Sequence, residues 1–426
     1  MNITIVGLGK IGIPLAVQFA SKGATVTGYD ISAPRVAEIN AGQDPLQAEP
    51  GLSEQIPALL SDGHIRATTD AGDAVSAADV VVLIVPVDID SAHRPDFTML
   101  DAALDAIGPH LTRGVLVIVE TTVPVGTTRH RVGPKIVAAS GFAAADFALA
   151  FSPERVSSGQ VLRDLRIYPK IVGGTDAAST ARAVEFYAAM LDAEIMPVRD
   201  AETAEFSKLV ETTYRDVNIA LANEFARIAD SVGVDALQAI AAANSQPYSH
   251  VHAPGPGVGG HCIPVYPYFL AAPESPGPST LDTDLIATAR AINDGMASYA
   301  VTRLGEALGS LDGATVVVLG LAYRAGVKES RHSSTFGLAS ALAAAGATAY
   351  VHDPLYTDDE IRAHGLTAPP AWPLRCDAIV VQAWHSEYAA LDLKAFDGLR
   401  AVLDPRAALD PATVTAHDAT YVGIGR

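Results

Sequence analysis

Cysteine and long apolar runs are scarce in this sequence. Only two cysteines, Cys262 and Cys376, occur among 426 residues. Two thiols cannot supply the disulfide framework of a small secreted protein, and they suit a reducing compartment, so we expect a cytoplasmic protein. The apolar runs, such as VVVLIVPV, are far shorter than the roughly 20 residues of a membrane span, and no secretory signal pattern follows Met1. We therefore expect no association with a membrane.

Basic residues are also few. The 29 lysines and arginines face 48 acidic residues, which gives a formal net charge of −19. A nucleic-acid backbone requires a basic face, so we expect no nucleic-acid partner, and any bound phosphate should be small and locally held. The 12 histidines are scattered without the spacing of a zinc site, so we expect no metal. A chain of this length suits two or three globular domains, at about 150 residues each.

The order of elements along the chain is α/β, helical, α/β. Short β-branched runs alternate with alanine-rich stretches in two blocks, a rhythm typical of parallel sheets. The predicted strands are NITIVGLG, ATVTGYD, DVVVLIVPV and VLVIVETTV in the first block, and ATVVVLGLAYR, ATAYVHDP, DAIVVQAW and RAVLDP in the second. Residues 201–233 contain no internal glycine or proline and predict one long helix, and another helix is expected at about 282–309. The expected domains are 1–199, 200–310 and 311–426.

A dinucleotide-binding pattern follows the first predicted strand. Gly7, Gly9 and Gly12 permit a tight turn, close approach to a pyrophosphate, and close packing of the helix that follows. Asp30 ends the second strand, where a carboxylate would bind an adenosine ribose and repel a 2′-phosphate, which favours NAD over NADP. Arg35 either covers the adenine or ribose or is an ordinary surface arginine. A glycine turn without a cofactor is the alternative for the whole pattern.

Two further segments carry groups suited to chemistry. Cys262 follows paired glycines in the loop GVGGHCIPVYPY, where a substrate could approach the thiol, whereas Cys376 suits a packed, inert thiol. His261 either lowers the pKa of the neighbouring thiol or only orients the loop. Lys208 and Thr212 share one face of the long helix, because they are four residues apart. A lysine there either stabilises a developing alkoxide or is solvated at the surface.

Six motifs occur in an order that resembles the nucleotide-sugar 6-dehydrogenases, the UDP-glucose and UDP-N-acetylhexosamine dehydrogenase family. They are GLGKIG, ETTVPVGTT, FSPERV, AEFSKLVETTYRDVNIALANEFA, PGPGVGGHCIP and GLAYRAGVKESRHS. The resemblance implies two Rossmann-like domains with parallel sheets, joined by a central helical region and a long connecting helix, in a homodimer. It also implies oxidation of a sugar C6 alcohol to a carboxylate by two NAD, through a cysteine thioester.

The resemblance assigns roles to individual residues. Cys262 matches the nucleophile, Lys208 the ammonium that stabilises the oxyanion, and Glu154 an acid assisting thioester hydrolysis. Thr122 matches a threonine that holds the reacting oxygen or its water, and Thr212 completes the expected catalytic set. The expected cofactor-binding residues are Gly7, Gly9, Ile11, Gly12, Asp30, Arg35, Pro86, Thr122 and Arg331. The expected substrate-binding residues are Glu154, Arg155, Lys208, Gly257, Gly259, Gly260 and Arg324.

Two positions depart from the family pattern. Thr212 stands where the family usually has asparagine, and Tyr266 stands where it usually has aspartate, four residues after Cys262. Threonine donates a hydrogen bond with a shorter reach than an amide, and tyrosine, with an ordinary pKa of ~10, cannot serve as a carboxylate base. Either Glu154 and Lys208 carry the proton transfers, or the last step is slow, or the reaction ends at the aldehyde. We favour full oxidation, because a cysteine has little use in an enzyme that makes only aldehyde.

The substrate is expected to be a UDP-N-acetylhexosamine, UDP-GlcNAc or UDP-ManNAc. The segments PGPGVGGHCIP and SPERV resemble that branch of the family more than the plain UDP-glucose branch. UDP- or dTDP-glucose is the alternative, since a few kcal/mol from one or two side chains decide such a preference. Two other classes stay open: a β-hydroxyacid or 6-phosphogluconate-type dehydrogenase, and a non-catalytic nucleotide-sugar or NAD sensor.

Overall fold

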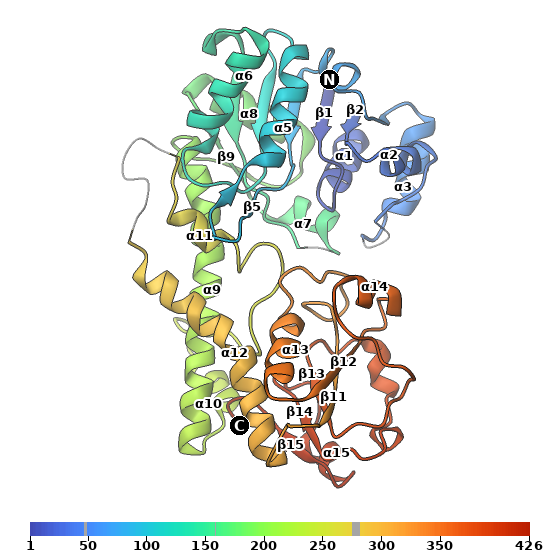
Figure 1. Ribbon diagram of the computed structural model, residues 1–426. Coiled ribbons are helices and arrows are strands. Elements are labelled where there is room, and N and C mark those ends of the chain that lie inside the picture. The colour runs from blue at the N-terminus through green and yellow to red at the C-terminus, as the bar shows by residue number, and fades with distance from the viewer. Residues whose placement is uncertain (47–48, 158, 275–281) are drawn as a thin grey trace. The chain divides into compact units, whose positions relative to one another are not determined.

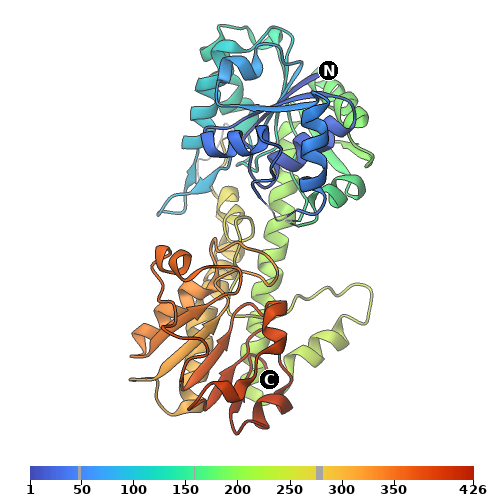
Figure 2. The same ribbon diagram turned by 90° about the vertical axis from the view of Figure 1, so that its right-hand side faces the viewer.

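The structure, a computed structural model, describes residues 1–46, 49–157, 159–274 and 282–426 (Figures 1 and 2). The chain forms two compact units. The first comprises residues 1–211 and 268–282, and the second comprises residues 212–267 and 283–426. Each unit contains its own sheet, so the predicted α/β fold with parallel sheets in separate domains is confirmed. Among the helices of the described residues, none is both long enough and apolar enough to cross a membrane.

The first unit is built on an eight-stranded sheet with the order β10-β9-β8-β7-β4-β1-β2-β3. The strands are β1 (Asn2–Val6), β2 (Thr25–Tyr29), β3 (Ile65–Thr68), β4 (Val80–Leu83), β7 (Leu116–Val119), β8 (Ala148–Phe151), β9 (Lys170–Gly174) and β10 (Ile195–Pro197). The four strands predicted in this half are confirmed as β1, β2, β4 and β7. The other four strands were not predicted from the sequence.

Helices flank this sheet and close its core. They are α1 (Gly12–Ser21), α2 (Ala33–Asn40), α3 (Leu52–Ser61), α4 (Ala71–Val75), α5 (Thr98–Ile107), α6 (Gly133–Ser140), α7 (Val161–Ile167) and α8 (Ala177–Met190), and a short hairpin pairs β5 (Asp88–Ile89) with β6 (Pro95–Asp96). The rings of Phe19 of α1 and Phe186 of α8 pack edge to face, with 5.3 Å between their centres. They belong to one apolar cluster, which also contains strand residues such as Ile5 and Val82. Burying these rings and aliphatic side chains holds the two helices on the sheet.

One strand pairing in this sheet is antiparallel. β8 and β9 run in opposite directions, with Phe151 opposite Gly173, whereas the other pairings of the sheet are parallel. β9 therefore starts at the edge of the sheet where β7 and β8 end. The sequence prediction of a parallel sheet did not include this reversal, which brings Lys170, the first residue of β9, to the edge formed by the carboxyl ends of the parallel strands.

Long helices follow the first sheet along the chain. α9 spans Ala201–Val232 and α12 spans Asp284–Leu308, which confirms the predicted helices at 201–233 and at about 282–309. The shorter helices α10 (Ala236–Ala243) and α11 (Tyr266–Leu270) lie between them in sequence. The division between the two units falls within α9, after Glu211.

The second unit contains a five-stranded, fully parallel sheet with the order β12-β11-β13-β14-β15. Its strands are β11 (Thr315–Leu319), β12 (Thr348–His352), β13 (Ala378–Val381), β14 (Ala401–Leu403) and β15 (Thr420–Val422), with helices α13 (Ser334–Ala344), α14 (Asp358–Ala363) and α15 (Pro411–Thr415). Val316 and Val318 contribute to one apolar cluster and Val317 and Leu319 to another. Both faces of the sheet are thus covered, as a parallel sheet requires. The four strands predicted here are confirmed as β11 to β14.

Candidate active site

The glycines that follow β1 have different structural roles. Gly7 has a φ of +101°, and a Cβ at Gly12 would lie only 1.8 Å from the Gly7 carbonyl oxygen, so both positions require glycine for the fold itself. A Cβ at Gly9, in contrast, would meet no atom within 4 Å. Gly9 lies three residues before α1, and the backbone N–H groups at the start of a helix can bind an anion. This arrangement fits a dinucleotide pyrophosphate.

Asp30 is fixed at the end of β2 by backbone hydrogen bonds. Its carboxylate accepts the N–H of Leu8 at 2.8 Å and the N–H of Ser32 at 2.8 Å, and it is almost fully buried. Arg35 forms an ion pair with the same carboxylate at 3.2 Å. Arg35 is therefore more than an isolated surface arginine, since it lies against the residue expected to bind the ribose.

The other residues predicted to bind the cofactor follow nearby strands or belong to the second unit. Ile11 directly precedes α1, and Pro86 lies just after β4. Thr122 lies three residues beyond β7 and is buried. These positions share the carboxyl edge of the parallel strands, where ligands of open α/β sheets bind. Arg331 lies in the second unit and is exposed.

A buried carboxylate ties the ETTVPVGTT segment to the first turns of α9. Glu205 accepts the N–H of Gly126 at 2.6 Å and the N–H of Thr128 at 2.8 Å, and burial raises its pKa to about 7. Lys208, one helical turn further along α9, is 7% exposed. The alternative of a solvated surface lysine is therefore wrong. Sequence analysis missed Glu205, although its spacing of three residues from Lys208 places both on neighbouring faces of the helix.

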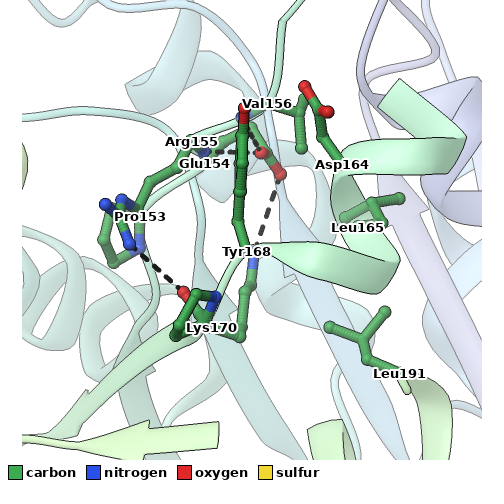
Figure 3. A pocket seen from close by; sticks show the side chains of 10 residues that line it. Pro153, Glu154, Arg155, Val156, Asp164, Leu165, Tyr168, Lys170 and Leu191 are labelled. Atoms are coloured by element: carbon green, nitrogen blue, oxygen red, sulfur yellow. Dashed lines mark hydrogen bonds and ion pairs between the residues drawn. The ribbon is translucent and has the colours of Figure 1, made fainter. Parts of the chain in front are cut away.

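Glu154 lies after β8 in a small hollow of the first unit (Figure 3). Its Oε1 accepts the N–H groups of Arg155 at 2.5 Å and Val156 at 2.7 Å. Its Oε2 is buried, accepts no hydrogen bond in the part of the chain that the structure describes, and lies 3.6 Å from Nζ of Lys170. Arg155 forms an ion pair with Glu211 of α9 at 2.7 Å. Sequence analysis predicted Glu154 and Arg155 but missed Lys170.

In the second unit, the glycine loop packs against the segment around Tyr323. The N–H of Gly260 donates to the carbonyl of Arg331 at 2.9 Å, and a Cβ at Gly260 would lie 3.3 Å from the Tyr323 ring. A Cβ at Gly259 would lie 2.6 Å from that of Tyr323, and one at Gly257 would lie 2.9 Å from Ser334 Oγ. Small residues are therefore needed to hold the loop that leads to the cysteine.

Cys262 lies beside a histidine that interacts with it. A hydrogen bond to Cys262 raises the pKa of His261, although burial acts in the opposite direction. An imidazolium next to a sulfur favours the thiolate, which is the nucleophilic form of cysteine. Of the two interpretations of His261, the structure thus supports the electrostatic one. Cys376 is 2% exposed, and burial raises its pKa to about 12, as expected for an inert thiol.

The remaining predicted residues also have defined positions. Thr212 of α9 is buried, and the N–H of Tyr266 at the start of α11 donates to the carbonyl of Cys262 at 2.9 Å. Arg324 is exposed and follows Tyr323 in the sequence. Burial raises the pKa of Tyr323, and the charge of Arg324 acts in the opposite direction. The first unit thus contains Thr122, Glu154 and Lys208, and the second contains Cys262 and the glycine loop.

A parallel sheet whose first turn leaves room for a pyrophosphate is typical of the dinucleotide-dependent dehydrogenases. Family models match the chain in three stretches: the NAD binding domain at residues 1–191, the central domain at 202–295 and the UDP binding domain at 317–411. The chain belongs to the UDP-glucose/GDP-mannose dehydrogenase family. It is a nucleotide-sugar dehydrogenase that uses a dinucleotide cofactor, and the resemblance found in its motifs is confirmed.

Individual relatives cover nearly the whole chain. A UDP-N-acetyl-D-mannosamine dehydrogenase of Methanocaldococcus jannaschii is 33% identical over 97% of this chain and 92% of its own length. An NDP-N-acetyl-D-galactosaminuronic acid dehydrogenase of Ralstonia solanacearum is 34% identical over 95% of both chains. The solved structure of a UDP-D-ManNAc dehydrogenase from Pyrococcus horikoshii superposes with a TM-score of 0.88 at 33% identity, covering 100% of this chain and 99% of that one. The family match excludes the β-hydroxyacid dehydrogenase alternative.

The different surroundings of Gly9 and Gly12 predict different effects of alanine. Gly9→Ala should leave the melting temperature unchanged and weaken NAD binding at least about tenfold, because its methyl group enters the space for the ligand. Gly12→Ala should destabilise the first unit by about 1–3 kcal/mol, because its methyl group overlaps a carbonyl oxygen. Thermal unfolding and titration with NAD measure both effects. Equal loss of stability in the two variants would contradict this assignment.

The two thiols should differ in reactivity. Brief treatment with iodoacetamide at pH 8 should modify Cys262, while Cys376, with a pKa of about 12, should react only after unfolding in urea. His261→Ala should slow modification of Cys262 severalfold at neutral pH, and the exposed His250→Ala serves as the control. Peptide mass spectrometry measures the rates. Faster labelling of Cys376 in the folded protein would refute the prediction.

Proposed function

We propose that this enzyme oxidises the C6 primary alcohol of a nucleotide sugar to the carboxylate in two successive two-electron steps, with NAD as oxidant and Cys262 as covalent carrier. The observation that carries the proposal is that Cys262 lies in a glycine-rich loop packed too closely for larger side chains, in a chain of the nucleotide-sugar dehydrogenase family. A thiol held in such a loop suits nucleophilic attack better than packing. A dehydrogenase that stopped at the aldehyde would not need it.

NAD, when bound, accepts the hydride removed in each oxidation. Gly9 and the start of α1 would hold its pyrophosphate, and Asp30 would accept hydrogen bonds from the adenosine ribose. The negative charge of Asp30 supports NAD over NADP, because it would repel a 2′-phosphate.

The side chains of this chain would share the remaining chemistry. Lys208 stabilises the alkoxide as the C6 hydroxyl loses its proton, an effect typically worth ~3 kcal/mol for one placed donor. Cys262 attacks the aldehyde to form a thiohemiacetal, and oxidation of that adduct leaves a thioester. Glu154 takes a proton from the water that cleaves the thioester. Thr122 and Thr212 donate hydrogen bonds to the reacting oxygen or its water.

The favoured substrate is a UDP-N-acetylhexosamine. The match to a UDP binding domain supports the UDP moiety, and relatives named for UDP-N-acetyl-D-mannosamine and NDP-N-acetyl-D-galactosaminuronic acid support an acetamido sugar. Gly257, Gly259, Gly260, Arg155 and Arg324 are assigned to substrate binding, and Arg331 to the cofactor. The three family matches support a division into residues 1–199, 200–310 and 311–426.

A homodimer and a cytoplasmic location are part of the same proposal. One face of α9 exposes large apolar side chains at helical spacing, namely Tyr214, Leu221, Phe225, Ile228 and Val232. Such a stripe on a single helix supports pairing with a second copy of the chain. The need to keep Cys262 reduced supports a cytoplasmic location.

The stoichiometry of the reaction tests the proposal. Purified enzyme given UDP-ManNAc, UDP-GlcNAc, UDP-glucose or dTDP-glucose should form two NADH per sugar with its true substrate, together with the corresponding uronic acid. Cys262→Ser should abolish acid formation and leave NAD binding unchanged. One NADH per sugar and an aldehyde trapped by hydroxylamine would contradict full oxidation. No NADH with any sugar nucleotide would favour a sensor.

A further inference from the structure

A buried ammonium group lies between two carboxylates in the first unit. Nζ of Lys170 is 2.9 Å from Oε2 of Glu120 and 3.6 Å from Oε2 of Glu154, and the Lys170 side chain is only 6% exposed. Burial of an ammonium group is costly unless opposite charges compensate it. Although burial acts to lower the pKa of Lys170, the two glutamates outweigh it and raise that pKa, so Lys170 is a cation.

The reversal of β9 places this cation at the edge of the sheet. β8 and β9 are antiparallel with Phe151 opposite Gly173, so Lys170, three residues before Gly173, lies on the side of Glu154, three residues after Phe151. Glu120 directly follows β7, the neighbour of β8 on its other side. The side chains of Glu120, Glu154 and Lys170 therefore come from the ends of adjacent strands, and the pairing of these strands brings them close together.

Glu120 and Tyr187 hold Lys170 from the interior side. Glu120 is fully buried, and its Oε1 accepts a hydrogen bond from the hydroxyl of Tyr187 on α8 while its Oε2 pairs with Lys170. Nζ of Lys170 also lies 5.0 Å from the centre of the Tyr187 ring, within the range of a cation–π contact. Both oxygens of Glu120 are thus engaged, one by Tyr187 and the other by Lys170.

Glu154 lies on the open side of the same cation. Its Oε2 accepts no hydrogen bond in the described part of the chain, and Lys170 is the cation that pairs with it. The hollow in front of it is lined also by Asp164 of α7, by Tyr168 and by Arg155 (Figure 3). The guanidinium of Arg155 pairs with Glu211 and donates to the Pro169 carbonyl.

We propose that Lys170 is a positioning residue that orients Oε2 of Glu154, through their ion pair, for hydrolysis of the thioester. The inference rests on the proposed function, in which Glu154 is the base. A proton of water moves to Glu154 Oε2 as the water oxygen bonds to the acyl carbon, and the C–S bond breaks to leave Cys262 as thiolate. Since Tyr266 replaces the aspartate that the resemblance predicts, this step depends on Glu154 alone among the assigned carboxylates.

Lys170→Met tests this role, because methionine keeps most of the length and removes the charge. The steady-state kcat should fall about 100-fold, the usual contribution of general base catalysis. A burst of two NADH per active site should precede the slow phase, because both oxidations precede hydrolysis. Lys170→Arg should restore kcat to within about tenfold of the wild type.

Two controls separate this role from a merely structural one. Lys22→Met removes a surface lysine paired with Asp192 and should leave both kcat and the time course of NADH formation unchanged. If Lys170→Met fails to fold with Glu120 unpaired, Lys170→Met combined with Glu120→Gln removes both charges and keeps an acceptor for Tyr187. This double variant should still show the burst followed by the slow phase.

The possible outcomes are distinguishable. A folded variant without Lys170 that turns over within twofold of the wild type, with no burst, would overturn the role of Lys170 and leave the proposed function intact. A wild-type enzyme that forms no NADH with any of the sugar nucleotides would overturn both.

Discussion

Ionisable side chains that are buried beside the sheet need partners of opposite charge or hydrogen bonds. This requirement determines which segments of the first unit are held together. Glu120, Glu205, Lys170 and Lys208 are each less than a tenth exposed. Glu205 is satisfied by backbone N–H groups of the ETTVPVGTT segment, and Lys170 by two glutamates. Because an unpaired buried charge costs several kcal/mol, these contacts hold strand ends and the start of α9 in fixed relation. Groups fixed in this way stabilise charge without reorganising.

The second unit meets a different constraint, which is steric. Its cysteine loop lies against Tyr323 and Ser334 so closely that side chains at Gly257 and Gly259 would overlap them. The bond from Gly260 to the Arg331 carbonyl fixes the residue immediately before His261. The imidazole of His261 and the sulfur of Cys262 are therefore held next to each other in the same loop. Cys376 is the contrasting case. Burial in the core raises the pKa of its thiol to about 12, so the thiol stays protonated and unreactive.

Local patterns in the sequence were sufficient to predict the glycine turn, the long helix α9 and four strands of each sheet. Strong periodicity and glycine spacing are local signals, and the structure confirms them. The antiparallel β9 was not predictable, because strand direction depends on pairing between segments distant in sequence. The contact of Lys170 with Glu120 and Glu154 depends on that direction, so it was missed as well. The burial of Lys208 was left open for a similar reason, since helical spacing alone does not show which face is covered.

The central claim is that Cys262 carries the sugar as a thioester between oxidation and hydrolysis. Mass spectrometry of the enzyme, quenched in acid during turnover with its nucleotide sugar, measures this directly. The account predicts a peptide containing Cys262 that is heavier by the acyl group of the sugar nucleotide, and its disappearance as substrate is consumed. Acid product formed at the full rate while Cys262 is never acylated, even in a variant with slowed hydrolysis, would contradict the account.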